Sequence, residues 1–118
     1  MSAQGINMLR KFPRPIKRLV VKIGSSSLAN YQLRPRRAQL RSLVDQIHKL
    51  RQQGIEVILV SSGAIVLGMG EMGLKRRPSD VASLQALAAV GQAVLMQTYS
   101  GLFKKYSLHC AQILLTWD

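Results

Sequence analysis

The chain has 118 residues, of which 47% are hydrophobic, so it is long enough for one domain that buries about two thirds of its unfolded surface. This composition excludes disorder as the main state of the chain. The 17 Lys and Arg residues against five Asp and Glu give a net charge of +12, which favours phosphates, nucleotides, nucleic acid or an acidic membrane surface as partners. Charge alone does not choose among them.

Targeting signals and the cysteine content limit the cellular compartments in which we expect the protein. No apolar stretch approaches the roughly 20 residues that cross a bilayer, and the N-terminus lacks the continuous apolar segment of a secretory signal. Cys110 is the only cysteine, which excludes an intramolecular disulfide and a thiolate zinc cluster. We therefore expect a cytoplasmic protein with no membrane partner.

The positive charge is concentrated at one end of the sequence. Residues 1–51 hold 12 of the 17 basic residues, and Asp45 is their only acid. Pro13 and Pro15 block helix and central-strand pairing, which predicts a basic, extended arm over residues 1–17 and a folded domain over residues 18–118. The arm is open to three interpretations: a solvated leader, a contact to nucleic acid, or an organelle transit sequence.

Two strands and a helix are predicted in the first half of the domain. A β-branched strand over residues 19–23 stops at Gly24. Pro35 suits the first turn of a helix whose apolar residues recur at spacings of three and four until Gly54 caps it. The nearly continuous apolar run over residues 55–60 is typical of a strand covered on both faces.

The second half is predicted to hold two helices and a last strand. A short helix over residues 64–67 is ended by the glycine-rich run 68–73, and Ser79 then caps a long helix that reaches Phe103. Gly91 in its middle predicts close approach of another backbone or a ligand. With a third strand over residues 110–115, the order β-α-β-α-α-β predicts a three-layer α/β/α sandwich with a mainly parallel sheet.

Both early strands end in small turns that are rich in hydrogen-bond donors: Gly24-Ser25-Ser26-Ser27 and Ser61-Ser62-Gly63-Ala64. Ligands of parallel sheets bind beyond the carboxyl ends of the strands, where free amides of turns and helix N-termini bind anions. Lys22 lies in an otherwise apolar strand, where a charge is costly without a partner. Either a bound phosphate neutralises it, or it reaches solvent or pairs with an acid.

Several other sites are not supported. Gly68–Gly73 matches G-x-G-x-x-G, but it follows a helix and not a strand, so a dinucleotide site is rejected. Neither His48 nor His109 has the neighbours of a catalytic triad or metal site, and Cys110 suits a small core residue better than a nucleophile. We expect no metal ligands in this chain, and we expect Tyr99, Phe103 and Tyr106 to pack between helices.

Four segments in consistent order resemble the N-terminal part of the glutamate 5-kinases, a group within the amino acid kinase family: Val20–Ser26, Val60–Ile65, Ala86–Gln92 and Gln112–Thr116. The resemblance covers residues 18–118. It implies ATP-dependent, Mg²⁺-supported phosphorylation of the γ-carboxylate of L-glutamate to glutamyl 5-phosphate, the first step of proline biosynthesis, in a cytoplasmic homo-oligomer.

The same resemblance implies roles for individual residues. Lys22 would be the point charge on the transferring phosphoryl group, which the amides of Gly24 and Ser25 hold in line. Ser62, with Gly63 and Ala64 beside it, matches the turn that holds glutamate in the family.

In the family the catalytic domain continues past the position of Asp118, with the remaining glutamate ligands, a second lysine and the adenine-binding segment. We therefore expect this chain to carry the N-terminal substrate and phosphate half, as an excerpt or as a natural truncation. Two alternatives stay open: a non-catalytic subunit that pairs with an intact kinase, and a basic module that binds nucleic acid or another polyanion. Only 5% aromatic residues and no groove-reading motif make nucleic acid the weaker expectation.

Overall fold

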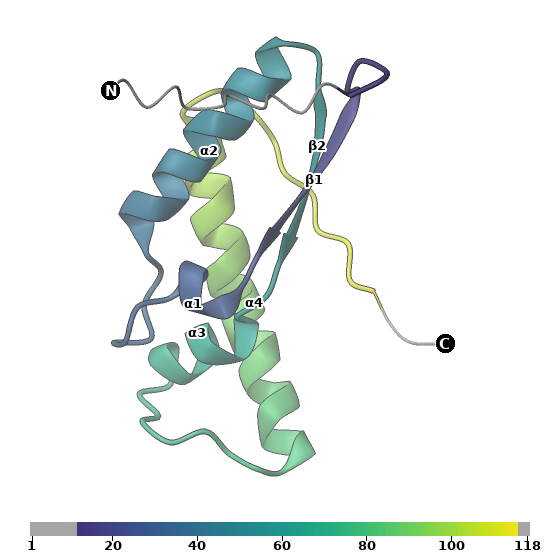
Figure 1. The fold of residues 1–118 in the computed structure, drawn as a ribbon. Helices are drawn as coiled ribbons and strands as arrows, with labels where there is room; N and C mark the ends of the chain where they lie inside the picture. The colour runs from purple at the N-terminus through teal and green to yellow at the C-terminus, as the bar shows by residue number, and fades with distance from the viewer. Residues whose placement is uncertain (1–11, 116–118) are drawn as a thin grey trace, which may run out of the picture.

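The computed structural model describes residues 12–115 (Figure 1). Most of the predicted basic arm, residues 1–11, and the end of the last predicted motif, residues 116–118, lie outside the described residues. Residues 12–17 are exposed and belong to no helix or strand. The elements follow in the order β1 (Arg18–Ile23), α1 (Ser25–Leu28), α2 (Arg37–Gln52), β2 (Glu56–Ser61), α3 (Ala64–Glu71) and α4 (Val81–Lys104).

Strands β1 and β2 form a parallel pair, as predicted. The register joins Arg18 to Glu56 at one end and Ile23 to Ser61 at the other, so both carboxyl ends lie side by side. Burial alternates along each strand, because successive side chains point to opposite faces of a sheet. The residues on the covered face, Ile23, Val57 and Leu59 among them, pack against the core.

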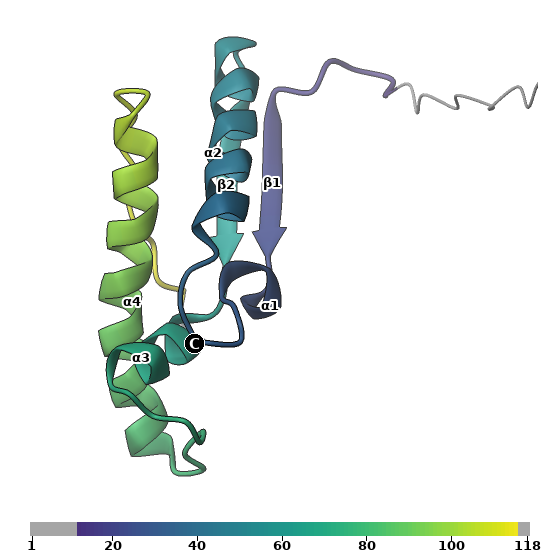
Figure 2. The ribbon, with the colours of Figure 1, turned by 90° about the vertical axis from the view of Figure 1, so that its left-hand side faces the viewer.

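Helix α2 lies over one face of this sheet, and α4 lies on the same side, next to the edge formed by β2 (Figure 2). The core between them is formed by buried side chains from the helices and the first turn: Leu28, Leu40, Val44, Ile47, Leu67, Leu95, Tyr99 and Phe103. On the other face Val20, Ile58 and Val60 are 60%, 48% and 47% exposed. Helices α2 and α4 lie on one side of this parallel pair, as expected when the chain carries an incomplete N-terminal half of an α/β/α sandwich.

Two helix starts differ from the prediction. Helix α2 begins at Arg37, since Pro35 forms an isolated bridge with Ala29 and so lies before the helix. Helix α4 is capped by Asp80 and not by Ser79: a carboxylate oxygen of Asp80 accepts a hydrogen bond from the Ser83 amide at 2.8 Å. Hydrogen bonding from Ser83, first from its side chain and then from its amide, holds the pKa of Asp80 below its usual value.

Helix α3 does not end at the glycine-rich run but continues to Glu71, with Gly68 and Gly70 inside it. A side chain at Gly68 would collide with the Leu87 carbonyl of α4, and one at Gly91 would collide with the Ala64 carbonyl of α3. The predicted close approach at Gly91 is therefore confirmed, and its neighbour is the backbone of α3. Packing of the two backbones offsets the low helix propensity of glycine, about 1 kcal/mol per residue.

The expectation that no stretch has the length of a membrane span needs a correction. Helix α4 has 24 residues and is apolar enough to cross a membrane by length and composition alone. One such helix is weak evidence, because the core helices of soluble proteins pass the same test. Leu87, Gly91, Leu95 and Tyr99 are buried on the side of α4 that contacts the rest of the fold.

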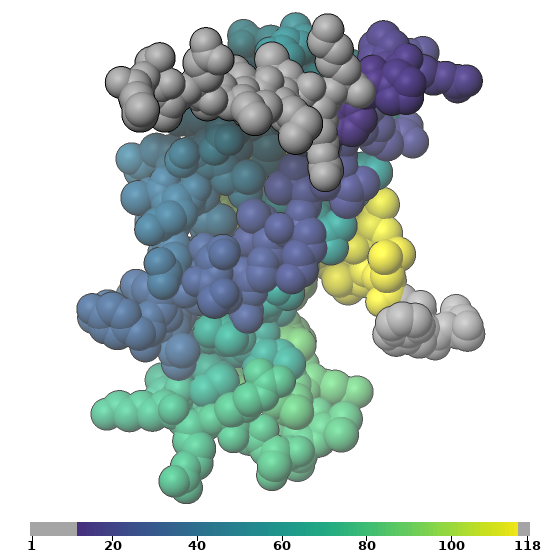
Figure 3. Space-filling view, viewed as in Figure 1, coloured from purple at the N-terminus to yellow at the C-terminus, as the bar shows by residue number. Residues whose placement is uncertain are grey.

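The predicted third strand is wrong for the described residues. Residues 108–115 have no regular structure, and Ile113, Leu114 and Leu115 are 84%, 67% and 91% exposed. Figure 3 shows the carboxyl-terminal end of the described residues as yellow atoms at the surface. A strand needs the hydrogen bonds of a neighbour, and among the described residues β2 pairs only with β1. Cys110 is half-buried against the core, as expected for a small core residue.

Candidate functional site: two turns at the end of the sheet

The turns that follow β1 and β2 meet because Ile23 and Ser61 are partners in the sheet. Beside them lies a hollow of about 360 Å³. Its lining comes from both turns, from the first turn of α3, from α4 and from the loop between these helices: Ser25, Ser61, Ser62, Gly63, Ala64, Ile65, Val66, Arg77 and Ala88. The lining contains several hydrogen-bond donors and no carboxylate.

The first turn folds into the short helix α1, which the sequence pattern did not predict. Gly24 precedes it with extended backbone angles, and its carbonyl oxygen accepts hydrogen bonds from the amides of Ser27 and Leu28, both at 3.1 Å. Leu28 is fully buried and anchors the turn in the core. Ser25, the first residue of α1, lines the hollow.

The second turn is fastened to the end of β1. The amide and the hydroxyl of Ser62 both donate to the carbonyl oxygen of Ile23, at 3.1 Å and 3.2 Å. Gly63 follows with φ 99°, a left-handed conformation that favours glycine. A Cβ atom at Gly63 would lie only 2.5 Å from Cδ2 of Leu28 and 3.4 Å from Cα of Ser25. The absence of a side chain at Gly63 thus lets the two turns touch.

The N-terminus of α3 faces the same hollow. No side chain caps it, and the amides of its first turn have no acceptor within the helix. Ala64, Ile65 and Val66, which carry these amides, all line the hollow. Free amides together with the positive end of the helix dipole favour an anionic ligand.

Lys22 lies beside this hollow and not in its lining. It pairs with Val60 on the open face of the sheet, and its Nζ atom lies 3.5 Å from the position that a Cβ atom on Gly24 would occupy. Among residues 12–115 no carboxylate lies within ion-pairing distance of Lys22, whose side chain is exposed. Of the two interpretations of Lys22, pairing with an acid is therefore excluded within the described residues, and an anion or solvent remains.

The structure thus brings together Ser25, Ser62, Gly63 and Ala64 around the hollow, with Lys22 and Gly24 next to it. Ser61 and Arg77 also line the hollow and were not predicted as site residues. Ser61 belongs to the donor-rich turn Ser61–Ala64, so its position in the sequence could have indicated a place at the site. Arg77 lies in an irregular loop without periodicity, so no pattern in the sequence connects it to the turns.

Metal ligands are not found in the described part of the chain. No three His, Cys, Asp or Glu side chains come together there, and the hollow has no acidic lining residue. The residues present do not fit a Mg²⁺ site, so we assign no metal ligand to them.

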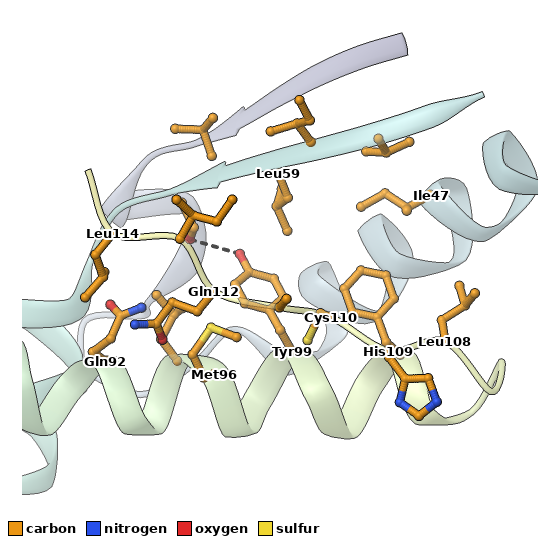
Figure 4. Close-up of a pocket in the computed structure, with 18 of the residues that line it drawn as sticks. Ile47, Leu59, Gln92, Met96, Tyr99, Leu108, His109, Cys110, Gln112 and Leu114 are labelled. Carbon is orange, nitrogen blue, oxygen red and sulfur yellow. Dashed lines mark hydrogen bonds between the residues drawn. The ribbon is translucent and has the colours of Figure 1, made fainter. Parts of the chain in front are cut away.

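A second, larger hollow of about 640 Å³ lies between β2, α4 and the segment 108–114 (Figure 4). Its walls are mainly apolar, with Leu59, Met96 and Leu108 among the lining residues. It shares Ser61 with the smaller hollow and contains none of the predicted site residues.

Comparison with known proteins decides the family. The model of the amino acid kinase family matches residues 17–117, which is most of the chain. The chain belongs to the amino acid kinase family. Both turns and every residue that lines the smaller hollow lie within the matched range.

Three similar curated proteins share one name. The glutamate 5-kinase of Symbiobacterium thermophilum is 46% identical over 108 residues, which is 92% of this chain and 41% of the relative. The glutamate 5-kinase of Thermobifida fusca is 45% identical over 114 residues, 97% of this chain and 29% of the relative. That of Nitrosospira multiformis is 50% identical over 102 residues, 86% of this chain and 27% of the relative. The chain spans about two fifths or less of the length of these relatives.

Proposed function

We propose that the protein containing this chain transfers the γ-phosphoryl group of ATP to the γ-carboxylate of L-glutamate, and that residues 18–118 form the N-terminal substrate and phosphate half of its catalytic domain. The observation that carries the proposal is the meeting of the two turns around a hollow that is lined by the N-terminus of α3 and by Arg77 and has no carboxylate. The names of relatives about 45% identical over most of this chain support glutamate as the acceptor.

The reaction joins one carboxylate oxygen of glutamate to the γ-phosphorus of ATP, while the bond from that phosphorus to the bridging oxygen breaks. ADP leaves with the electron pair of the broken bond, and the product is an acyl phosphate. Phosphoryl transfer needs positioning and charge neutralisation more than covalent help from the protein. Side chains that supply positive charge and amides that supply hydrogen bonds suit this task.

We assign these tasks to residues of the two turns. The exposed ammonium group of Lys22, next to Gly24, neutralises charge on the transferring phosphoryl group, and the amides of Gly24 and Ser25 hold its oxygens. Ser62, Gly63 and Ala64 form the turn that holds the glutamate carboxylate, with the amides of Gly63 and Ala64 as donors. The amide and hydroxyl of Ser62 fix this turn, because both donate to the Ile23 carbonyl. We assign no Mg²⁺ ligand to this chain; Mg²⁺ would supply charge neutralisation to the phosphates of ATP.

The pathway, the compartment and the oligomeric state in this proposal rest on the same similarity to glutamate 5-kinases. The product serves proline biosynthesis, and the enzyme works in the cytoplasm as a homo-oligomer. Residues 1–17 precede the domain as a basic arm, of which residues 12–17 are exposed and without regular structure.

The test uses the complete gene product with ATP, Mg²⁺ and L-glutamate, and it traps the acyl phosphate with hydroxylamine as a coloured hydroxamate. We expect glutamate-dependent hydroxamate formation. Lys22→Ala should lower turnover by about two orders of magnitude or more, because an electrostatic clamp is removed. Lys17→Ala, which removes another exposed lysine just before β1, is the matched control. If the wild type forms no hydroxamate, the proposed reaction is wrong. If the two variants turn over equally fast, the proposed role of Lys22 is wrong.

A further inference from the structure

Tyr99 connects α4 to the second turn, although it lies far from that turn in the sequence. Its side chain is 4% exposed, and its hydroxyl lies 3.0 Å from Oγ of Ser61 at the end of β2, as the dashed line in Figure 4 shows. A buried hydroxyl is costly unless it is hydrogen-bonded. Burial also raises the pKa of Tyr99 above its ordinary value.

The proton of Ser61 fixes the direction of this hydrogen bond. Oγ of Ser61 also lies 3.3 Å from the carbonyl oxygen of Ser62, which can only accept. A serine hydroxyl has one proton, so when Ser61 donates to Ser62, Tyr99 must donate to Ser61. The orientation of the Ser61 hydroxyl is therefore set from α4.

The hydrogen bonds continue from Ser62 to the end of β1. The amide and hydroxyl of Ser62 both donate to Ile23, the residue directly before Gly24. Hydrogen bonds thus link Tyr99, Ser61, Ser62 and Ile23, from α4 through the second turn to the end of β1. A rigid support of this kind is what a binding site needs to hold its donors in place.

We propose that Tyr99 is a positioning residue for the glutamate-holding turn, acting through Ser61. The inference rests on the proposed function, because that function makes this turn the glutamate site. Tyr99 touches no substrate in this account: it lines the larger hollow and not the smaller one, and Ser61 lies between it and the site. Its loss should therefore weaken glutamate binding and leave the handling of ATP unchanged.

The experiment compares Tyr99→Phe with Tyr106→Phe in the complete gene product. Both changes remove one phenolic oxygen that makes a hydrogen bond, to Ser61 in the first case and to Asp45 in the second. We measure KM for glutamate, KM for ATP and kcat by hydroxamate formation, and the Kd of glutamate by calorimetry. Tyr99→Phe should raise KM and Kd for glutamate about tenfold, with KM for ATP and kcat within about twofold of wild type. Tyr106→Phe should leave all four values near wild type.

Ser61→Ala tests whether Tyr99 acts through Ser61. If it does, the double variant Tyr99→Phe/Ser61→Ala should bind glutamate no more weakly than Ser61→Ala alone. The inference is wrong if Tyr99→Phe and Tyr106→Phe have equal KM and Kd values for glutamate, or if the losses of glutamate affinity add up in the double variant. In either case the proposed function stands as long as the wild type phosphorylates glutamate. A wild type that neither binds nor phosphorylates glutamate overturns both.

Discussion

The two halves of α4 are attached to the molecule by different means. In the amino-terminal half, backbone meets backbone: Gly91 faces the Ala64 carbonyl of α3, and Gly68 of α3 faces the Leu87 carbonyl. In the carboxyl-terminal half and just beyond it, side chains make the contacts. There Tyr99 bonds to Ser61, Phe103 enters the core, and the Tyr106 ring stacks on His48 of α2 with centroids 3.9 Å apart.

The difference concerns how each contact tolerates change. Two backbones in contact leave no room for even one methyl group. A side chain introduced at a glycine would therefore disrupt the entire contact between α3 and the amino-terminal half of α4. Side-chain contacts are removed one at a time, and each loss is graded by burial and by the partner left behind. Three substitutions test this contrast.

The largest effect is expected for Gly91→Ala. Its Cβ atom would collide with backbone atoms of Ala64 and Gly68, which cannot rotate away as a side chain does, so the two helices must separate. We expect the free energy of unfolding to fall by about 3 kcal/mol or more, measured by urea denaturation. Gly101→Ala is the matched control, because a Cβ atom there meets nothing within 4 Å. It should stabilise α4 by about 0.5–1 kcal/mol, and a similar loss in both variants would contradict the backbone contact.

An intermediate, pH-dependent effect is expected for Tyr106→Phe. The Tyr106 hydroxyl donates to Asp45, and this bond is the main reason that the pKa of Asp45 lies below its ordinary value of 3.8. A lowered pKa in the folded state stabilises the protein above the ordinary value, and that contribution is lost as the pH falls through the folded-state value. The variant should therefore melt on the order of 3 °C below wild type at pH 7, with the gap closing below about pH 4.

Tyr31→Phe is the control for this experiment, because Tyr31 is 90% exposed and its hydroxyl makes no hydrogen bond among the described residues. Melting curves at several pH values check both variants. A gap between Tyr106→Phe and wild type that widens in acid would show that Asp45 does not receive this hydrogen bond in solution.

The smallest effect is expected for Lys105→Ala. Nζ of Lys105 lies 3.7 Å from Oδ1 of Asp45, but both side chains are substantially exposed and water screens the pair. The fall in melting temperature should stay at about 2 °C or less and vanish in 0.5 M salt. Lys104→Ala, one residue earlier, serves as the control. A salt-independent loss at Lys105 alone would instead indicate packing of its stem, since its Nζ lies 5.0 Å from the Tyr106 ring centroid.

Local patterns predicted most of the fold. The strands were predicted to within about one residue, and the apolar spacing of α2 gave its course, because both signals depend on neighbours along the chain. The prediction of a strand over residues 110–115 was wrong, since an apolar sequence becomes a strand only when a partner strand shares its hydrogen bonds. The glycine-rich run of α3 predicted the end of a helix, because the packing of these glycines against α4 depends on residues that are distant in the sequence.

The site was predicted less completely. Parallel strands place their carboxyl ends together, so the two turns could be named in advance, and Ser25, Ser62, Gly63 and Ala64 do surround one hollow. Their roles, like that of Lys22, stay predictions. Arg77 and the bond from Tyr99 to Ser61 come from tertiary contacts that no spacing in the sequence encodes. The polyanion-binding alternative also stays a prediction.

The glycine contact between α3 and α4 has a consequence for the order of folding. These helices are separated by one short loop, whereas β1 and β2 can pair only after all of α2 has been placed between them. Closing the shorter loop costs less chain entropy, so the helix pair should assemble before the parallel sheet. In pulsed hydrogen exchange during refolding, amides of α4 would then gain protection earlier than those of β2. The two turns would be completed last, on a helical base that is already in place.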